Sequence, residues 1–362
     1  MKQTMYNKQR IHKTNGLELG LFTSGDYLPH PTTKKRQTPS ERIQQIIQMG
    51  QLAEQAGLDI FQVGEAHQKH YLSQSQMTIL ASIAATTNQI KLSTGATIIG
   101  VADPVRVFED AATIDLISNG RMELVCGRSQ RLGLFKLLGY SLDDYEELFD
   151  EKFQLLLALN HQEVVNWTGE FRPPLEDQLI LPRPYNQEQL PIYRAVRGSV
   201  NSLREAAQMG VPIYCAQLDR DLDTMKAYLN VYREELSNAG YKSDDMPIAT
   251  AGYLYVGPDS QQAIKKYQYY ISAGYDQLQT DIYESVDFEH AQSVDSLINV
   301  GSPSLVVDKL LKQHEELGHQ RFVGQIDFGG VTFDEIRRTI DLLGEKVIPE
   351  VKKYTAKNRV GD

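Results

Sequence analysis

Two serines in the second half of the chain, Ser199 and Ser202, lie where they could bind an anion. Gly198 and Ser199 directly precede a segment with helical spacing of its apolar residues, and Ser202 follows one turn later. The first backbone amides of a helix have no acceptor within the helix, and the Ser199 hydroxyl adds another donor. This pattern indicates a phosphate site, although a serine that only caps its helix gives the same sequence.

Two histidines are candidates for proton transfer. His67 and His70 follow an apolar run that ends at Glu65. An unperturbed imidazole titrates near pH ~6.5, so either ring could take up or release a proton at neutral pH. The alternative for each is a structural hydrogen bond at the edge of a domain.

The elements that would position these residues alternate in type along the chain. Short apolar runs predict strands at 17–23, 60–65, 90–99, 121–128, 192–196, 211–216, 248–256 and 321–328. Helical spacing predicts helices at 40–57, 76–88, 104–118, 142–159, 199–209, 222–239, 260–273, 303–317 and 332–353. Eight strands joined by helices favour a closed (β/α)8 TIM barrel over an open doubly wound sheet. The carboxyl ends of such strands converge on one cavity.

We expect one domain over residues 1–362, with insertions after the fourth and seventh strands. Residues 1–16 form an N-terminal extension, and 161–190, with Trp167 and four prolines, form the first insertion. The second, 274–301, is rich in acidic and aromatic residues. It is a candidate lid that excludes water from the site, and the alternative is a solvated acidic connection.

Composition and charge exclude several classes of partner. The 362 residues are 41% hydrophobic and 23% charged, with a formal net charge of −10. The longest basic block is 34–36, which argues against nucleic acid and anionic membranes as partners. Since no apolar run approaches about eighteen residues, we expect neither a signal peptide nor a membrane span. We therefore expect a cytoplasmic protein. Cys126 and Cys215 lie in apolar runs and are predicted as buried thiols, with no metal site.

One stretch is specific enough to suggest a family. Residues 103–106 read DPVR and residues 109–121 read EDAATIDLISNGR. This text resembles the run that joins the third and fourth strands in bacterial luciferase-like enzymes. VGEAH at 63–67, PRP at 182–184 before PIY at 191–193, Gly198-Ser199, and GSP at 301–303 also fit. The resemblance extends over roughly residues 17–353.

The resemblance implies a TIM barrel of the luciferase-like type that binds reduced flavin mononucleotide (FMN), or the deazaflavin F420, at the strand ends. Arg128 aligns with an arginine that binds the flavin phosphate; the alternative is a salt bridge at the rim, with Glu146 or Glu147. Gly95-Ala96 aligns with a small pair that often has a cis peptide beneath the flavin ring, although small residues also relieve crowding in a barrel. Thr97 is then placed to hydrogen-bond the ring, and Gly198, Ser199 and Ser202 to bind the phosphate.

Two positions depart from the luciferase pattern. Ala66 stands where luciferase has its catalytic histidine, so that His67, which matches the next histidine, becomes the catalytic candidate. Glu146 stands where luciferase has a second phosphate arginine. The resemblance therefore implies an oxidoreductase, first a monooxygenase that uses reduced FMN and O2 on a small organic substrate. The alternatives are F420-dependent hydride transfer, a flavin-binding protein without turnover, and a barrel without a cofactor.

Partners follow from the same interpretation. No Gly-x-Gly-x-x-Gly fingerprint follows a strand, so a bound nicotinamide is not expected, and a separate flavin reductase is the predicted source of electrons. A homodimer through the helices near strands two and three is implied by the family alone.

Overall fold

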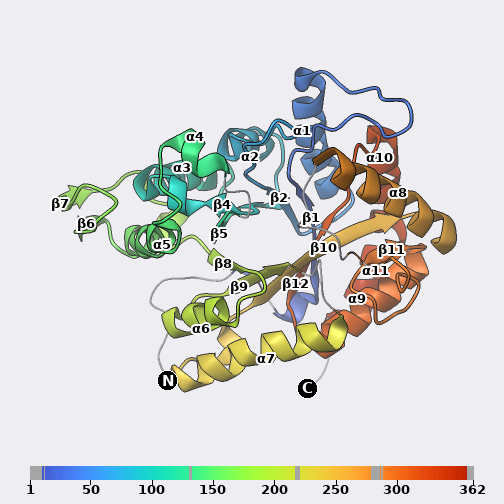
Figure 1. The fold of residues 1–362 in the computed structure, drawn as a ribbon. Coiled ribbons are helices and arrows are strands. Elements are labelled where there is room, and N and C mark those ends of the chain that lie inside the picture. Colours follow the sequence, from blue (N-terminus) through green and yellow to red (C-terminus); the bar gives the residue numbers. More distant parts are fainter. Residues whose placement is uncertain are drawn as a thin grey trace.

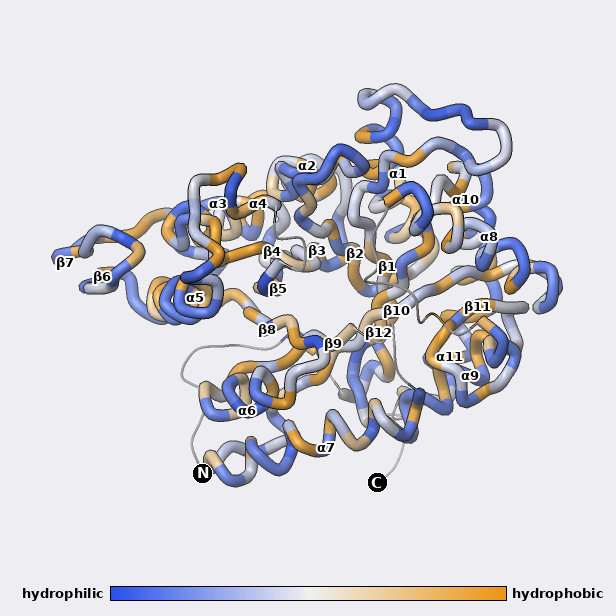
Figure 2. The backbone as a smooth tube through the Cα atoms, in the orientation of Figure 1, coloured by the Kyte–Doolittle hydropathy of each residue, from blue (hydrophilic) through white to orange (hydrophobic). Residues whose placement is uncertain are grey.

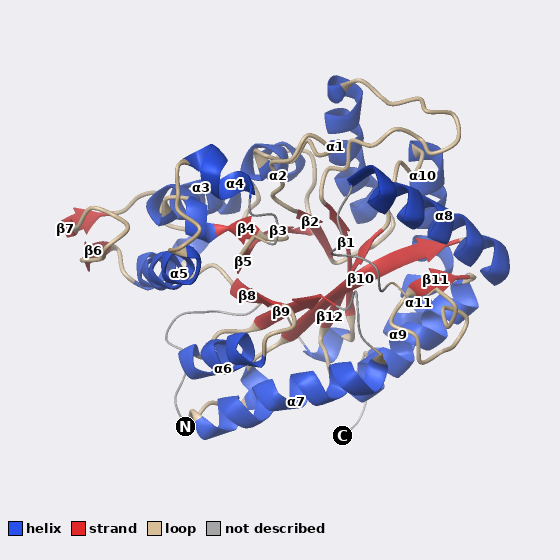
Figure 3. Ribbon diagram, in the orientation of Figure 1, coloured by secondary structure: helices blue, strands red, loops and turns tan. Residues whose placement is uncertain are grey.

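The predicted closed barrel is confirmed. The computed structural model describes residues 10–11, 13–129, 133–216, 221–278, 286 and 288–356. Within them, parallel strands pair around a complete circle in the order β1-β2-β3-β5-β8-β9-β10-β12 and back to β1 (Figures 1 and 3). The barrel strands are β1 Glu18–Thr23, β2 Ile60–Val63, β3 Lys91–Thr94, β5 Met122–Gly127, β8 Ile192–Val196, β9 Ile213–Ala216, β10 Ile248–Val256 and β12 Arg321–Gln325.

Helices surround the strands (Figure 3). They are α1 Pro39–Gln55, α2 Gln76–Ala84, α3 Pro104–Ile117, α4 Gly133–Leu138, α5 Tyr145–His161, α6 Val200–Met209, α7 Leu222–Asn238, α8 Ser260–Leu278, α9 Pro303–Leu317, α10 Phe333–Leu342 and α11 Ile348–Thr355. Figure 2 shows hydrophobic and hydrophilic residues alternating along α6 and α7, as expected where one face of a helix packs on the barrel. None of the helices described here has the length and apolar character of a membrane span.

Several elements differ from the sequence prediction in extent. The expected strand 90–99 is divided into β3 and β4 Thr97–Ile98, with a cis peptide bond between Gly95 and Ala96 at the interruption. The expected helix 332–353 contains a π-helical turn, Leu343–Val347, between α10 and α11. α4 was not predicted, because its six residues are too few to show a helical period.

Residues 162–190 leave the barrel between α5 and β8. They carry an antiparallel hairpin, β6 Val164–Trp167 and β7 Leu175–Leu179, which protrudes from the rest of the molecule (Figure 1).

The interval 274–301 is held to the barrel at both of its ends. α8 continues to Leu278, and β11 Asn299–Gly301 pairs with the carboxyl-terminal part of β10. The buried Lys309 donates hydrogen bonds to the carbonyls of Ala291, Ile298 and Val300. Residues 279–285 and 287, the centre of the predicted lid, lie outside the described residues.

Ion pairs fill the amino end of the barrel. Arg321, at the start of β12, donates to Glu18 at 2.7 Å and to Glu123 at 2.6 Å, and Lys91 pairs with Glu18. Burial raises the pKa of Glu18, but the charges and hydrogen bonds of Arg321 and Lys91 outweigh burial, so that its pKa lies below the usual value. Two positive and two negative groups therefore balance one another inside the barrel.

The motif that suggested the family also has an architectural role. Arg121, just before β5, donates to the backbone carbonyls of Ala84, Thr87, Ile90 and Ser118. In this way one guanidinium joins the end of α2, the approach to β3 and the end of α3. Its neighbour in the motif, the fully buried Asp115, accepts hydrogen bonds from the amides of Met122 and Tyr185 and from Arg10.

Candidate active site

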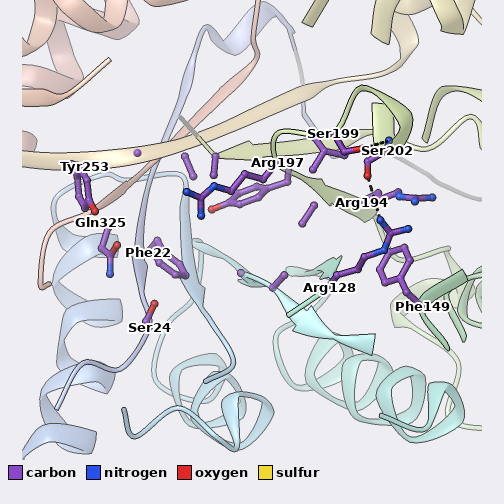
Figure 4. Close-up of a pocket in the computed structure, with 18 of the residues that line it drawn as sticks. Phe22, Ser24, Arg128, Phe149, Arg194, Arg197, Ser199, Ser202, Tyr253 and Gln325 are labelled. Carbon is purple, nitrogen blue, oxygen red and sulfur yellow. Dashed lines mark hydrogen bonds between the residues drawn. The ribbon is translucent and has the colours of Figure 1, made fainter. Parts of the chain in front are cut away.

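A cavity of about 380 Å³ opens at the carboxyl ends of the barrel strands (Figure 4). Its wall is built from residues within the barrel strands and just beyond their carboxyl ends, and from α5, α6 and α8. The lining residues are Phe22, Ser24, Gly95, Ala96, Arg128, Tyr145, Glu146, Phe149, Arg194, Ala195, Val196, Arg197, Ser199, Ser202, Tyr214, Ala216, Ala251, Gly252, Tyr253, Tyr275, Gln325 and Phe328.

Five of the residues selected from the sequence meet in this wall. Gly95 and Ala96 lie beside the interruption of the third strand, Arg128 follows β5, and Ser199 and Ser202 begin α6. The cavity therefore brings together positions that are far apart in the sequence, as the barrel topology predicts.

The other three selected residues lie outside the set of lining residues. Gly198 has a φ of +78° and turns the chain from β8 toward α6, a conformation that favours glycine. Thr97 is buried, and its hydroxyl accepts a hydrogen bond from Gln76 Nε2 at 2.9 Å. His67 Nε2 lies 2.8 Å from Glu65 Oε1.

His67 and Thr97 belong to one hydrogen-bonded group beside the wall. Glu65 connects them, since its Oε1 contacts His67 while its Oε2 accepts from the amide of Ile98 at 2.8 Å and from Gln76 at 3.3 Å. The group joins the end of β2 to β4 and to the start of α2. These hydrogen bonds connect β4, the second part of the interrupted third strand, to its neighbours.

One end of the cavity is suited to an anion. Ser199 caps α6, and its hydroxyl accepts from the amide of Ser202 at 3.4 Å. Arg128 Nη1 donates to Ser202 Oγ at 3.4 Å, and the ring of Phe149 lies 4.7 Å from the Arg128 guanidinium carbon. Arg128 Nε and Nη2 are buried and have no hydrogen-bond partner within the described part of the chain, although Nη2 has ion-pair contacts. A helix start, two hydroxyls and a guanidinium thus share one corner.

A second arginine lies in the same corner and was missed in the sequence. Arg194, in β8, is 2% exposed, and its guanidinium carbon lies 4.9 Å from the Phe149 ring centre. The sequence did contain a signal for it, namely a charged residue inside the apolar run 192–196. Such a residue is expected in a barrel strand only where its charge is compensated by polar or charged partners. Burial lowers the pKa of Arg194, and the nearby Glu205 opposes this effect.

Three carboxylates surround the two arginines. Arg128 Nη2 lies 2.6 Å from Glu146, 3.5 Å from Asp150 and 3.6 Å from Glu205. Arg194 pairs with Glu205 and lies 3.7 Å from Asp150. Burial raises the pKa of Asp150, and the two arginines only partly offset this. The rim salt bridge between Arg128 and Glu146, one alternative offered by the sequence, is present.

The opposite end of the cavity is aromatic. Phe22, Tyr253, Tyr275 and Phe328 contribute to its wall, and the ring centres of Tyr275 and Phe328 are 4.9 Å apart. Figure 4 shows Phe22, Tyr253 and Gln325 across the cavity from Arg128. This end therefore favours a flat or apolar group.

A closed (β/α)8 barrel with a ligand-sized cavity at the carboxyl ends of its strands has the arrangement in which TIM-barrel enzymes place their active sites. Comparison with known proteins places it more narrowly. The family model described as luciferase-like monooxygenase matches residues 17–321. The chain belongs to this family, as the motif at 103–121 indicated.

Two relatives with named activities are similar over most of their length. The alkanal monooxygenase alpha chain of Photorhabdus luminescens is 22% identical over 87% of this chain and 93% of its own. The oxygenase component of the flavin-dependent trigonelline monooxygenase of Acinetobacter baylyi is 20% identical over 87% of this chain and 91% of its own.

Solved structures share the fold. Monooxygenase RslO1 from Streptomyces bottropensis has a TM-score of 0.80 at 23% identity, covering 92% of this chain and 99% of its own. The oxygenating constituent of 3,6-diketocamphane monooxygenase from Pseudomonas putida, in complex with FMN, has a TM-score of 0.74 at 16% identity, covering 92% and 98%. An F420-dependent secondary alcohol dehydrogenase has a TM-score of 0.70 at 19% identity, covering 93% and 99%.

Proposed function

We propose that this protein is a monooxygenase that uses reduced FMN and O2 to oxidise a small organic substrate. The observation that carries the proposal is the division of one cavity into an anion corner and an aromatic end. The division matches a cofactor that has a phosphate at one end of its tail and a flat ring at the other.

The residues present fit such a cofactor. The start of α6 with Ser199 and Ser202, together with Arg128, would hold the phosphate. The backbone at Gly95-Ala96 would face the ring, and a side chain at Gly95 would be crowded, because a Cβ there would come 3.1 Å from Phe22 Cδ2. When bound, reduced flavin supplies the electrons that activate O2 for transfer of one oxygen atom to the substrate. The protein orients the partners and keeps water out.

The substrate would bind beside the flavin ring, between the ring and the aromatic side chains of the cavity wall. Charge among the described lining residues is carried by Arg128, Glu146, Arg194 and Arg197, and none of these belongs to the aromatic cluster. Figure 4 shows Ser24 and Gln325 on the aromatic side of the cavity, and the side chain of Arg197 directed toward that side. We therefore expect a largely apolar substrate with one polar or negatively charged group that these side chains can reach.

FMN is favoured over F420 by the sequence relatives. Both relatives described above are named monooxygenases and align over most of this chain. The F420-dependent enzyme is similar in fold, at 19% identity. Hydride transfer with F420 is therefore the second candidate, and a protein that binds flavin without turnover is the third.

The test is an anaerobic titration of the purified protein with reduced FMN, followed by flavin absorbance, and then exposure to O2 with an oxygen electrode. Saturable binding and oxygen uptake that responds to small aromatic ketones or aldehydes would support the monooxygenase. Binding of reduced F420 but not of FMN would favour hydride transfer. Binding of FMN with no change in oxygen uptake would favour the third candidate, and failure of both cofactors to bind would overturn all three.

The proposal includes partners. A separate flavin reductase would supply reduced FMN, and the name of the trigonelline enzyme, an oxygenase component, is in keeping with such a division. We also propose a homodimer through the face of α2 and α3, where Leu116 and Ile117 are 42% and 45% exposed. Light scattering would measure the mass in solution, and a monomer at micromolar concentration would contradict the dimer.

A further inference from the structure

The anion corner already contains an anion. Glu146 lines the cavity, and its carboxylate lies 2.6 Å from Arg128 Nη2. This is the distance at which a phosphate oxygen would form a charge-assisted hydrogen bond with the same group. The carboxylate and a flavin phosphate would therefore compete for one face of the guanidinium.

The local charge is unfavourable to a further anion. Two arginines face three carboxylates within the ion-pair distances given above, which leaves one net negative charge. A third arginine, Arg197, also lines the cavity, but Figure 4 shows its side chain directed away from Arg128 and Arg194. A phosphate dianion that enters this corner meets the excess negative charge before it gains its hydrogen bonds.

Of the three carboxylates, Glu146 is the one that can leave. Glu205 pairs with the buried Arg194 and also accepts from Asn201 Nδ2 at 2.6 Å, so that it is held by two partners. Asp150 lies between both arginines. Glu146 belongs to the first turn of α5 and its side chain is 59% exposed, so that rotation toward solvent breaks its ion pair with Arg128 and rehydrates the carboxylate.

We propose that Glu146 is a specificity-determining residue of the cofactor site. Its carboxylate pairs with Arg128 where an anionic ligand would otherwise bind, and it must be displaced before a phosphate binds. This inference rests on the proposed function. Its consequence is that the protein distinguishes FMN from riboflavin, which lacks the phosphate, less strongly than Arg128, Ser199 and Ser202 alone would allow.

The experiment compares two flavins in matched variants. Glu146→Gln keeps the size of the side chain and removes its charge. The control is Glu147→Gln, which makes the same change of net charge at the next, exposed position of the helix. Dissociation constants for FMN and riboflavin are measured by quenching of flavin fluorescence. The readout is binding, so it does not depend on turnover.

The expected result is specific for the phosphate. Glu146→Gln should tighten FMN binding by about tenfold and change riboflavin binding by less than about twofold, since only FMN reaches Arg128. Glu147→Gln should leave both constants within about twofold of the parent. Glu146→Arg, which adds a further positive charge to the corner, should tighten FMN binding further.

The contrary results are distinct. Unchanged or weaker FMN binding in Glu146→Gln, with folding verified by thermal unfolding, would overturn the role of Glu146. Equal tightening of FMN and riboflavin would overturn it too, because the effect would then not involve the phosphate. If no protein in the series, parent included, binds either flavin, the proposed function fails rather than this inference alone.

Discussion

The two ends of the barrel use the same chemistry for different purposes. At the amino end, Arg321 and Lys91 face Glu18 and Glu123, and the charges balance in a site where Arg321 is almost completely buried. At the carboxyl end, Arg128 and Arg194 face three carboxylates beside an open cavity. Both are arginine–carboxylate clusters, although the carboxylates of the first are on strands and those of the second are on helices α5 and α6.

The two clusters differ in their charge balance and in their access to solvent, and these differences distinguish a structural cluster from a binding cluster. In the amino-terminal cluster, Arg321 makes four hydrogen bonds to two carboxylates. In the carboxyl-terminal cluster, Arg128 Nε has no hydrogen-bond partner in the described chain, and Glu146 is largely exposed. Buried groups without full partners are costly, and they persist where a ligand completes them. The comparison therefore predicts losses of stability at one end and losses of binding at the other.

The largest effect is expected from Arg321→Met. Removal of this guanidinium leaves Glu18 and Glu123 buried with only Lys91 to compensate them. We expect the free energy of unfolding to fall by about 3–5 kcal/mol, as measured from urea denaturation.

Arg106→Met is the matched control for this substitution. Arg106 also pairs with two carboxylates, Glu109 and Asp110, but its side chain is 69% exposed. Its replacement should cost about 0.5 kcal/mol or less. Similar losses in the two variants would mean that burial and charge balance do not distinguish these clusters.

The next effect concerns the other end of the barrel. Arg128→Met should weaken FMN binding by about 10- to 100-fold, the range expected when hydrogen bonds to a charged group are lost, and should leave riboflavin binding nearly unchanged. Its stability should fall by only about 1 kcal/mol, because Glu146 returns to water. Fluorescence titration gives the dissociation constants, and urea denaturation of the same preparation gives the free energy of unfolding. A stability loss as large as that of Arg321→Met, with unaltered FMN binding, would assign Arg128 to the scaffold.

A third prediction concerns a buried histidine at the amino end, which burial holds in its neutral form. His319, before β12, is fully buried, and its Nδ1 lies 2.6 Å from Thr250 Oγ1. Burial, with the nearby His314 and Arg233 charges, lowers the pKa of His319 to about 3. The unfolded chain takes up this proton below a pH of about 6.5 and the folded chain does not, so stability is lost as the pH falls through this window.

The measurement is the unfolding free energy of the parent and of His319→Asn at pH 7 and pH 5. Between these values the parent should lose about 2 kcal/mol more than the variant, which has no imidazole to protonate. Because the carboxylates titrate equally in both proteins, the difference isolates His319. The same pH dependence in both would show that His319 is not the group responsible.

Much of the barrel was predictable from sequence because its strands are short apolar runs. The prediction for 248–256 matches β10 at both ends. The division of 90–99 into two strands was not predicted, although the resemblance indicated the cis peptide at Gly95-Ala96 where the strand is interrupted. The motif that indicated the family contains Arg121 and Asp115. These residues join elements at the amino end of the barrel and do not line the cavity.

The candidate site was predictable only in part. Arg128, Ser199 and Ser202 came from motif positions and do meet in the cavity. Arg194 and Glu205 were missed, because their roles depend on contacts between β8, α5 and α6. Glu146 was identified as a departure from the family pattern, but its 2.6 Å approach to Arg128 is a fact of tertiary structure. The sequence therefore indicated the groups that attract a phosphate more completely than those that oppose it.

The smallest effect tests whether the carboxyl end also contains a purely structural layer. Thr97 was selected as a ring-binding residue, yet it is 2% exposed and its hydroxyl accepts from Gln76. Thr97→Val keeps the shape and removes that acceptor, so the unfolding free energy should fall by about 1 kcal/mol. FMN binding should change by less than about twofold if the wall at Gly95 and Ala96 stands between Thr97 and the ring. A tenfold loss for both FMN and riboflavin would instead mean that the hydroxyl reaches the ring, and the boundary between scaffold and site would then lie one residue further from the cavity.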